Sequence, residues 1–111
     1  RYASLFKLLY SASILSSQMS EKLVLMLQAA TFDVGLVRGL PKGVPVANKF
    51  GEMTREDMVQ LHDCGIIYYP DNPYVLCVMT RGHKNTELED VIEDVSRMVY
   101  REVDGRRGRL P

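Results

Sequence analysis

Residues 44–52 read Val-Pro-Val-Ala-Asn-Lys-Phe-Gly-Glu, and the interpretation of the whole chain depends on this stretch. An apolar run typical of a strand reaches Lys49, and Gly51 follows two residues later. A lysine at the end of a strand can hold a positive charge over a cleft. A glycine has no Cβ, so a ligand can approach the backbone closely. The stretch therefore predicts a strand over residues 44–50 whose end is open to a ligand.

Two further strands are predicted downstream, at residues 64–69 and 74–80, because both runs are rich in Ile, Val and Tyr. The intervening Pro70-Asp71-Asn72-Pro73 has strong turn chemistry, so we expect an antiparallel hairpin. Cys64 and Cys77 fall on these neighbouring strands. A cross-strand disulfide is conceivable, but the sequence favours two buried free thiols.

The connection between the first two strands, residues 51–63, is polar and long enough to hold a short helix. Thr54 would cap that helix, with Asp57 three residues later. His62 then belongs to a loop, as does His83. Neither histidine has metal-ligand spacing to the other, and no metal site is expected.

Helices are predicted on both sides of the strands. Apolar positions recur at helical spacing over residues 3–13 and again over residues 17–29, where Ser16 or Ser17 offers an N-cap. Residues 31–43 should hold a short helical turn and then a loop. A capping box, Thr86-Glu87-Leu88-Glu89, opens a last helix. Its expected apolar stripe is Leu88, Val91, Ile92, Val95, Met98 and Val99.

The order of helix, helix, three antiparallel strands and helix is an α+β arrangement. A chain of 111 residues is one domain at most. Its formal net charge is zero, which gives no indication of a nucleic-acid or anionic-membrane partner. There is no signal-peptide pattern, and the chain starts at Arg1 rather than Met, which suggests a piece of something longer. We divide it into residues 1–104 and a solvated basic tail, residues 105–111.

Several segments together resemble the C-terminal part of a class A β-lactamase, within the penicillin-recognising serine hydrolases. The resemblance spans about residues 2–103, and Asn48-Lys49-Phe50-Gly51-Glu52 falls where the family has its Lys-Thr-Gly strand motif. The other matching segments are Leu5-Phe6-Lys7-Leu8-Leu9, the capped helix after Ser17, Gly39-Leu40-Pro41-Lys42-Gly43, Gly65-Ile66-Ile67, residues 74–80, and the helix from Glu87 onward. The implied fold is an antiparallel sheet with packed helices, as in the C-terminal part of a β-lactamase.

The resemblance gives roles to four residues of this stretch. Lys49 would face the carboxylate of a β-lactam or of a peptidoglycan stem peptide. Residues 49–52 would form one wall of the site. Gly51 would keep this wall open, and the backbone N–H of Glu52 would be one of two oxyanion-hole donors. Phe50 stands where the family has Thr or Ser, whose hydroxyl binds the substrate carboxylate. Losing such a hydrogen bond costs about 1.5–3 kcal/mol, roughly tenfold to a hundredfold in affinity.

The nucleophile of the family is the serine of a Ser-x-x-Lys motif that lies well upstream, as does a Ser-Asp-Asn motif. Ser4-Leu5-Phe6-Lys7 matches the first motif literally, but it lies only about 45 residues before Lys49, where the family needs well over a hundred. We therefore interpret Ser4 and Lys7 as exposed residues of an amphipathic helix. The resemblance implies no cofactor, and it implies a periplasmic or extracellular location.

Two functions remain open at this point. The chain is either the C-terminal portion of a serine hydrolase, inactive alone and completed by the N-terminal part of the same fold, or a non-catalytic relative that binds or supports structure. Lys49 with Gly51 favours the hydrolase, and Phe50 favours the non-catalytic relative. We also expect the isolated chain to be unstable, because residues 74–80 would form an open sheet edge.

Overall fold

The fold is seen in a computed structural model that describes residues 1–13, 15–28 and 33–107. Along the chain the elements are α1 (Tyr2–Tyr10), α2 (Ser17–Gln28), the 3-10 helix η1 (Val37–Gly39), β1 (Val46–Arg55), β2 (Met58–Ile67), β3 (Tyr74–Gly82) and α3 (Asn85–Arg106). The strands form one antiparallel sheet in the order β1-β2-β3, so the predicted α+β class is confirmed.

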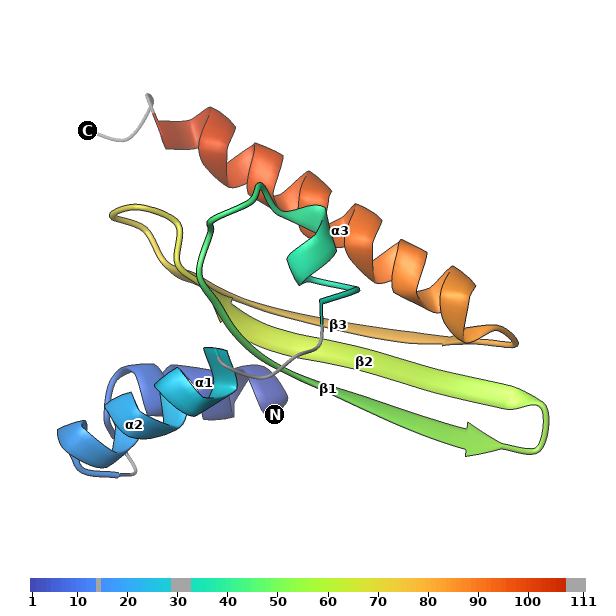
Figure 1. The fold of residues 1–111 in the computed structure, drawn as a ribbon, viewed down its shortest axis with the longest axis horizontal. Helices are drawn as coiled ribbons and strands as arrows, with labels where there is room; N and C mark the ends of the chain where they lie inside the picture. The colour runs from blue at the N-terminus through green and yellow to red at the C-terminus, as the bar shows by residue number, and fades with distance from the viewer. Residues whose placement is uncertain (14, 29–32, 108–111) are drawn as a thin grey trace.

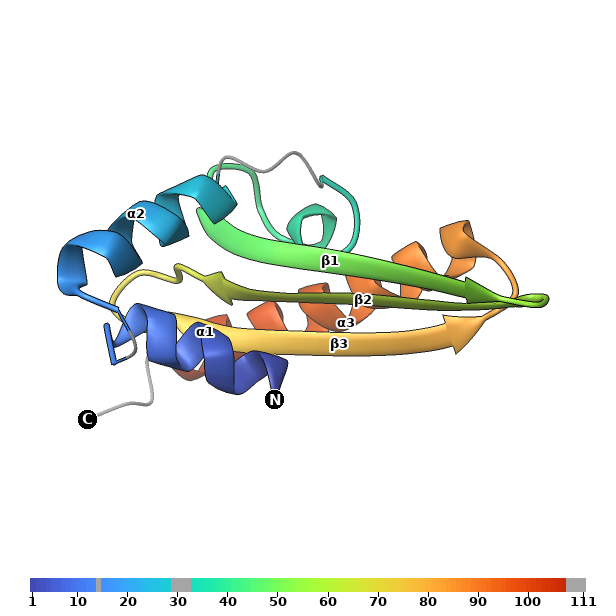
Figure 2. The same ribbon diagram turned by 90° about the horizontal axis from the view of Figure 1, so that it is seen from below.

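Helices cover both faces of this sheet (Figures 1 and 2). α3 crosses one face, where Leu88 and Ile92 pack against Val59 and Leu61 of β2 and against Leu36. α1 and α2 lie on the other face near the start of β1. Their buried side chains join strand residues in a second cluster that consists of Phe6, Val24, Ala47, Cys64 and Ile66. Beyond these two helices the β1–β2 hairpin extends far toward its turn (Figure 1).

The connection predicted over residues 51–63 is wrong, because this segment is the far half of the β1–β2 hairpin. The strands pair without interruption from Val46↔Ile67 to Arg55↔Met58. Only Glu56 and Asp57 form the turn, and Glu56 takes a positive φ of 58°. Thr54 therefore caps no helix. The hairpin forms because residues 58–61 alternate between the two faces of the sheet, which places Val59 and Leu61 in the core under α3.

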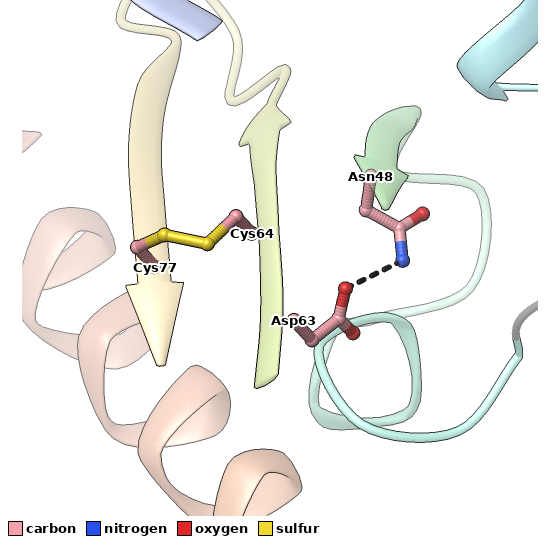
Figure 3. Close-up of a disulfide and its surroundings, with 4 residues drawn as sticks. All are labelled: Asn48, Asp63, Cys64 and Cys77. Atoms are coloured by element: carbon pink, nitrogen blue, oxygen red, sulfur yellow. Dashed lines mark hydrogen bonds between the residues drawn. A yellow bond between two sulfur atoms is a disulfide. The ribbon is translucent and has the colours of Figure 1, made fainter. Parts of the chain in front are cut away.

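The hairpin predicted around residues 70–73 is confirmed, although both of its strands are longer than expected. The pairing of β2 with β3 runs from Ile67↔Tyr74 to Val59↔Gly82, so β3 continues for two residues beyond its predicted end at residue 80. In this register Cys64 lies directly opposite Cys77. The two form a disulfide with a Cα–Cα distance of 4.0 Å (Figure 3), and the prediction of two free thiols is wrong.

α3 begins one residue before the predicted capping box. Its N-cap is Lys84, which makes no side-chain capping bond, so Thr86 lies within the first turn rather than at the cap. Leu88 and Ile92 are buried as expected, together with Ser96. Val91 and Met98 are 47% and 64% exposed. At 100° per residue, these two side chains fall on the same flank of the helix, away from the ridge that contacts the sheet.

The first two helices agree with their predictions apart from the end of α1. That helix stops at Tyr10 instead of continuing to residue 13. At the start of α2, the backbone N–H of Met19 donates to Ser16 Oγ at 3.2 Å, which confirms Ser16 as a cap. Ala29, the predicted end of α2, lies outside the described residues. Among the described residues, no helix combines the length and apolar character needed to cross a bilayer.

Candidate functional site

The motif residues lie in the middle of β1, at an edge of the sheet. Lys49 pairs in register with Cys64 and Glu52 with Leu61. Since β2 is the central strand, β1 has a strand partner on one side only within the described residues. The outer edge of β1 can therefore present main-chain groups to a ligand, as the resemblance requires for the N–H of Glu52.

Side chains along β1 alternate between the two faces of the sheet. Lys49 lies on the face of α1 and α2, as Ala47 does, and its side chain is exposed. Its ammonium donates a hydrogen bond to the main-chain oxygen of Phe50 at 3.0 Å. The same nitrogen lies 5.2 Å from the centroid of the Phe50 ring. The positive charge is thus held beside the strand edge, in contact with water.

Phe50 lies on the opposite face and packs, half-buried, against the core cluster beneath α3. Its ring contributes to the core of the sheet, and it has no hydroxyl to offer a carboxylate. The cost of Phe50 to carboxylate recognition therefore stays a prediction. Lys49 is the cation that the motif supplies at this point of the strand.

Gly51 is packed closely by a residue that the sequence placed in a loop. His62 lies on β2, directly opposite Gly51, so the loop prediction for this histidine is wrong. A Cβ at Gly51 would overlap Cε1 and Nε2 of the His62 ring. The absence of a Cβ at Gly51 leaves room for the imidazole across the sheet, and His62 becomes part of the wall that carries Lys49.

Glu52 carries an exposed carboxylate on the α3 face, where it accepts a weak hydrogen bond from Thr54 Oγ1 at 3.4 Å. The predicted oxyanion-hole role needs only its main-chain N–H, and this role stays a prediction. His83 lies in the segment between β3 and α3, as expected. Its Nδ1 is 3.1 Å from the main-chain oxygen of Asp57, which ties that segment to the β1–β2 turn.

The register sorts the charged side chains of the sheet by face. Those that can be cationic share the face of α1 and α2, and the carboxylates share the face of α3. The first group is Lys49, Arg55, His62 and Arg81, and the second is Glu52 and Asp63. On the cationic face a shallow pocket of about 280 Å³ is lined by Gln60, Leu61, His62, Met79, Thr80 and Arg81. This distribution favours anionic ligands on the side of Lys49.

Asp63 is a fully buried carboxyl group on β2 that sequence reasoning passed over. Asn48 Nδ2 donates to its Oδ1 at 3.0 Å (Figure 3), and the Leu36 N–H donates to its Oδ2 at 3.1 Å. Burial raises the pKa of Asp63 to about 6, against the lowering effect of these two hydrogen bonds. An acidic residue inside a strand of apolar neighbours was the available signal, but residue 63 stood at the end of the supposed connection.

The literal Ser-x-x-Lys match is separate from this site. Ser4 and Lys7 are exposed on α1, which packs against α2, β2 and β3, whereas Lys49 is on the edge strand β1. At the C-terminal end, α3 continues to Arg106, two residues into the predicted tail. There Arg106 pairs with Glu102 at 2.7 Å, and the Arg107 guanidinium lies 5.7 Å from the Tyr69 ring centroid. Arg109 lies outside the described residues.

Comparison with known proteins agrees with this geometry. Residues 1–103 match the profile of the beta-lactamase enzyme family. The structure is similar to that of PBP-A, with a TM-score of 0.78 and 25% sequence identity over 93% of this chain and 38% of the other. It is also similar to the L158E mutant of PBP-A, solved as an acyl-enzyme complex with penicillin G, with a TM-score of 0.77 and the same identity and coverage.

No curated protein matches the sequence. The chain spans 38% of the length of the two solved structures, so it corresponds to a part of their fold. The family profile covers most of the chain and both structural neighbours share its elements. The chain belongs to the beta-lactamase enzyme family, among the penicillin-recognising serine hydrolases.

Proposed function

We propose that this chain supplies the carboxylate-binding wall of a serine hydrolase that forms an acyl-enzyme with β-lactams or with related peptidoglycan peptides. The observation that carries the proposal is the exposed ammonium of Lys49 beside the edge of β1 that faces away from β2. The Lys49 side chain leaves β1 on the face of the sheet where the ionisable strand side chains are all basic. The acyl-enzyme of the PBP-A mutant with penicillin G supports the substrate class.

In this proposal each residue of the wall has a separate task. Lys49 binds the substrate carboxylate and so places the scissile carbonyl. The N–H of Glu52 donates to the oxyanion that forms when the serine oxygen attacks that carbonyl carbon. The amide nitrogen leaves with a proton, and water then hydrolyses the ester that joins the acyl group to the serine. The serine and its base come from outside this chain.

The remainder of the fold would also cover the apolar side chains that this chain leaves exposed. Leu25 and Met26 on α2 are 57% and 63% exposed, and Val91 and Met98 on α3 are similarly open. Leu, Met and Val are among the residue types most often buried in folded domains, and several of them exposed on one flank of a helix indicate a contact surface. Their exposure supports the proposal that an N-terminal part, on the same or a separate chain, completes the hydrolase.

A non-catalytic binding or structural module is the second candidate. Phe50 favours it, because the ring is committed to the core beneath α3 and contributes no hydroxyl to the site. In that case the wall would still attract anions through Lys49, but no serine would be acylated.

The two candidates differ in a direct assay on the whole protein, with its N-terminal part present. We expect labelled penicillin to acylate it, and Lys49→Gln to slow acylation about tenfold to a hundredfold, the effect of losing a hydrogen bond to a charged group. Lys42→Gln is the matched control, since Lys42 is exposed in the loop before β1. Absence of any adduct and of nitrocefin turnover in the unmodified protein would leave the non-catalytic module as the function.

A further inference from the structure

A continuous series of buried hydrogen bonds connects α3 to the strand that carries Lys49. Ser96 Oγ on α3 donates to the main-chain oxygen of Leu36 at 2.7 Å. The N–H of Leu36 donates to Asp63 Oδ2 at 3.1 Å, and Asn48 Nδ2 donates to Asp63 Oδ1 at 3.0 Å. Ser96, Leu36 and Asp63 are 0% exposed and Asn48 is 4% exposed. Every donor and acceptor of this series therefore belongs to this chain.

Stability alone gives a poor account of such a series. Apolar side chains of similar size would fill the same space between β1, β2 and α3 without the desolvation of a carboxyl group. A satisfied polar network in a core instead restricts the geometries that its members can take. The restriction here falls on Asn48, which is joined to Lys49 by a single peptide bond.

The strand needs this restriction because it is an edge. Within the described residues β2 is the one strand that pairs with β1, so the strand ladder limits the rotation of the β1 peptides from one side. The Asn48–Asp63 bond adds a side-chain tie to β2 on the α3 face, while Lys49 projects from the other face. A fixed Asn48 therefore fixes the direction in which Lys49 leaves the strand.

Among the residues that the structure describes, the charged groups of the neighbouring elements do not compete for Asp63. On α3, Glu93 pairs with Arg97 at 2.7 Å and lies 3.9 Å from Arg38 of η1. On β1 and β2, Lys49 and His62 lie on the opposite face of the sheet. The two hydrogen bonds from Asn48 and Leu36 are therefore the contacts that orient the carboxyl group.

We propose that Asp63 is a positioning residue: it sets the geometry of Lys49, Phe50 and Gly51 through Asn48, and α3 sets Asp63 through Leu36. The consequence for acylation rests on the function proposed above, whereas the consequence for the strand does not. The two are measured separately in the whole protein, by amide hydrogen exchange of residues 49–52 and by the rate of acylation with labelled penicillin.

Asn48→Leu keeps the branching of the side chain at Cγ and removes the donor. We expect amide exchange at residues 49–52 to become about tenfold faster and acylation about tenfold slower, as for the loss of a hydrogen bond to a charged group. The matched control is Tyr69→Phe, which removes the 2.6 Å bond that Tyr69 Oη donates to Asp104 Oδ1, also a bond to a carboxylate. That variant should leave amide exchange at residues 49–52 and the rate of acylation within about twofold of the original protein, because neither Tyr69 nor Asp104 belongs to β1 or pairs with it.

Exchanging the two groups should restore the geometry. In Asn48→Asp/Asp63→Asn the new amide at position 63 accepts from the Leu36 N–H and donates to the new carboxylate at position 48, so each bond of the series keeps a donor and an acceptor. Both rates should return to within about threefold of the original protein. Should Asn48→Leu fail to fold, Ser96→Ala breaks the same series at α3 and should speed exchange at residues 49–52 about threefold.

Equal exchange at residues 49–52 in Asn48→Leu and Tyr69→Phe would overturn the proposal, whatever the acylation rate. Faster exchange with unchanged acylation, in a protein that penicillin acylates, would overturn the link from Asp63 to the site. If the unmodified protein is never acylated, the proposed function fails, and exchange at residues 49–52 decides the positioning role by itself.

Discussion

The imidazole of His62 lies against Gly51, in the space that any side chain at position 51 would take. The two residues face each other across β1 and β2, on the same face as Lys49. Glycine at this position thus has a packing reason within the chain, in addition to the close approach of a ligand that the motif suggests. This reason can be separated from ligand binding by a measurement of stability.

Gly51→Ala should destabilise the whole protein by about 1–2 kcal/mol, because the new methyl group forces the His62 ring from its place. His62→Ala removes the obstacle, so Gly51→Ala should cost less than about 0.5 kcal/mol in that background. Thermal unfolding of the four proteins in this double-mutant cycle gives the coupling. Additive effects of the two substitutions would show that the ring moves aside freely.

At this scale the sequence identified Lys49 but missed two of its neighbours. Lys49 and Gly51 were visible because a short motif and its surroundings matched a known family. His62 and Asp63 are adjacent in sequence and point to opposite faces of β2. Their roles depend on the pairing of β2 with β1, which the polar composition of residues 51–63 concealed. A residue whose partner lies across a sheet has no local signal of its role.

Among the elements, the β1–β2 hairpin differs most from its prediction. Its turn, Glu56-Asp57, contains neither glycine nor asparagine, the usual residues where φ is positive. The alternation of residues 58–61 was the remaining signal, and it is too short to distinguish a strand from a helix by itself. The β2–β3 hairpin was predictable because Pro, Asp and Asn mark its turn.

The β2–β3 hairpin also contains the disulfide, which joins residues 13 positions apart. A loop of this length corresponds to a stabilisation of about 3 kcal/mol, through the restriction of the unfolded chain. Cys64→Ala/Cys77→Ala should lower the melting temperature of the oxidised whole protein accordingly. As a reference, the variant and the original protein are both unfolded and reduced in excess reductant. Their free energies of unfolding should then differ by less than about 1 kcal/mol, because neither contains the disulfide. Equal melting of both oxidised proteins would contradict the stabilising role.

As a whole molecule, the chain has helices on both faces of its sheet and still leaves several surfaces uncovered. Within the described residues the outer edge of β3 has no strand partner. Met79 on that strand is 64% exposed. On α3, Val91 is 47% exposed and Met98 is 64% exposed. An unpaired edge beside apolar side chains invites association with other chains.

Residues 1–107 expressed alone should therefore self-associate and unfold without a sharp transition, whereas the whole protein should be soluble and unfold cooperatively. Light scattering and thermal melts test both parts. Val91→Lys/Met98→Lys should reduce the association of the isolated chain but destabilise the whole protein, where these side chains would be buried. A monomeric isolated chain with a cooperative melt would show that the fold needs no completing part.

The disulfide has one more consequence, which concerns the continuity of the main chain. Residues 64–77 form a closed covalent ring through the two sulfur atoms, and the turn between β2 and β3 lies inside that ring. A protease that cut this turn would leave both strands attached to one another. Insertions there would enlarge the ring without moving Cys64, which is opposite Lys49 in the neighbouring strand. The position of the wall that carries Lys49 should therefore not depend on the length of the turn.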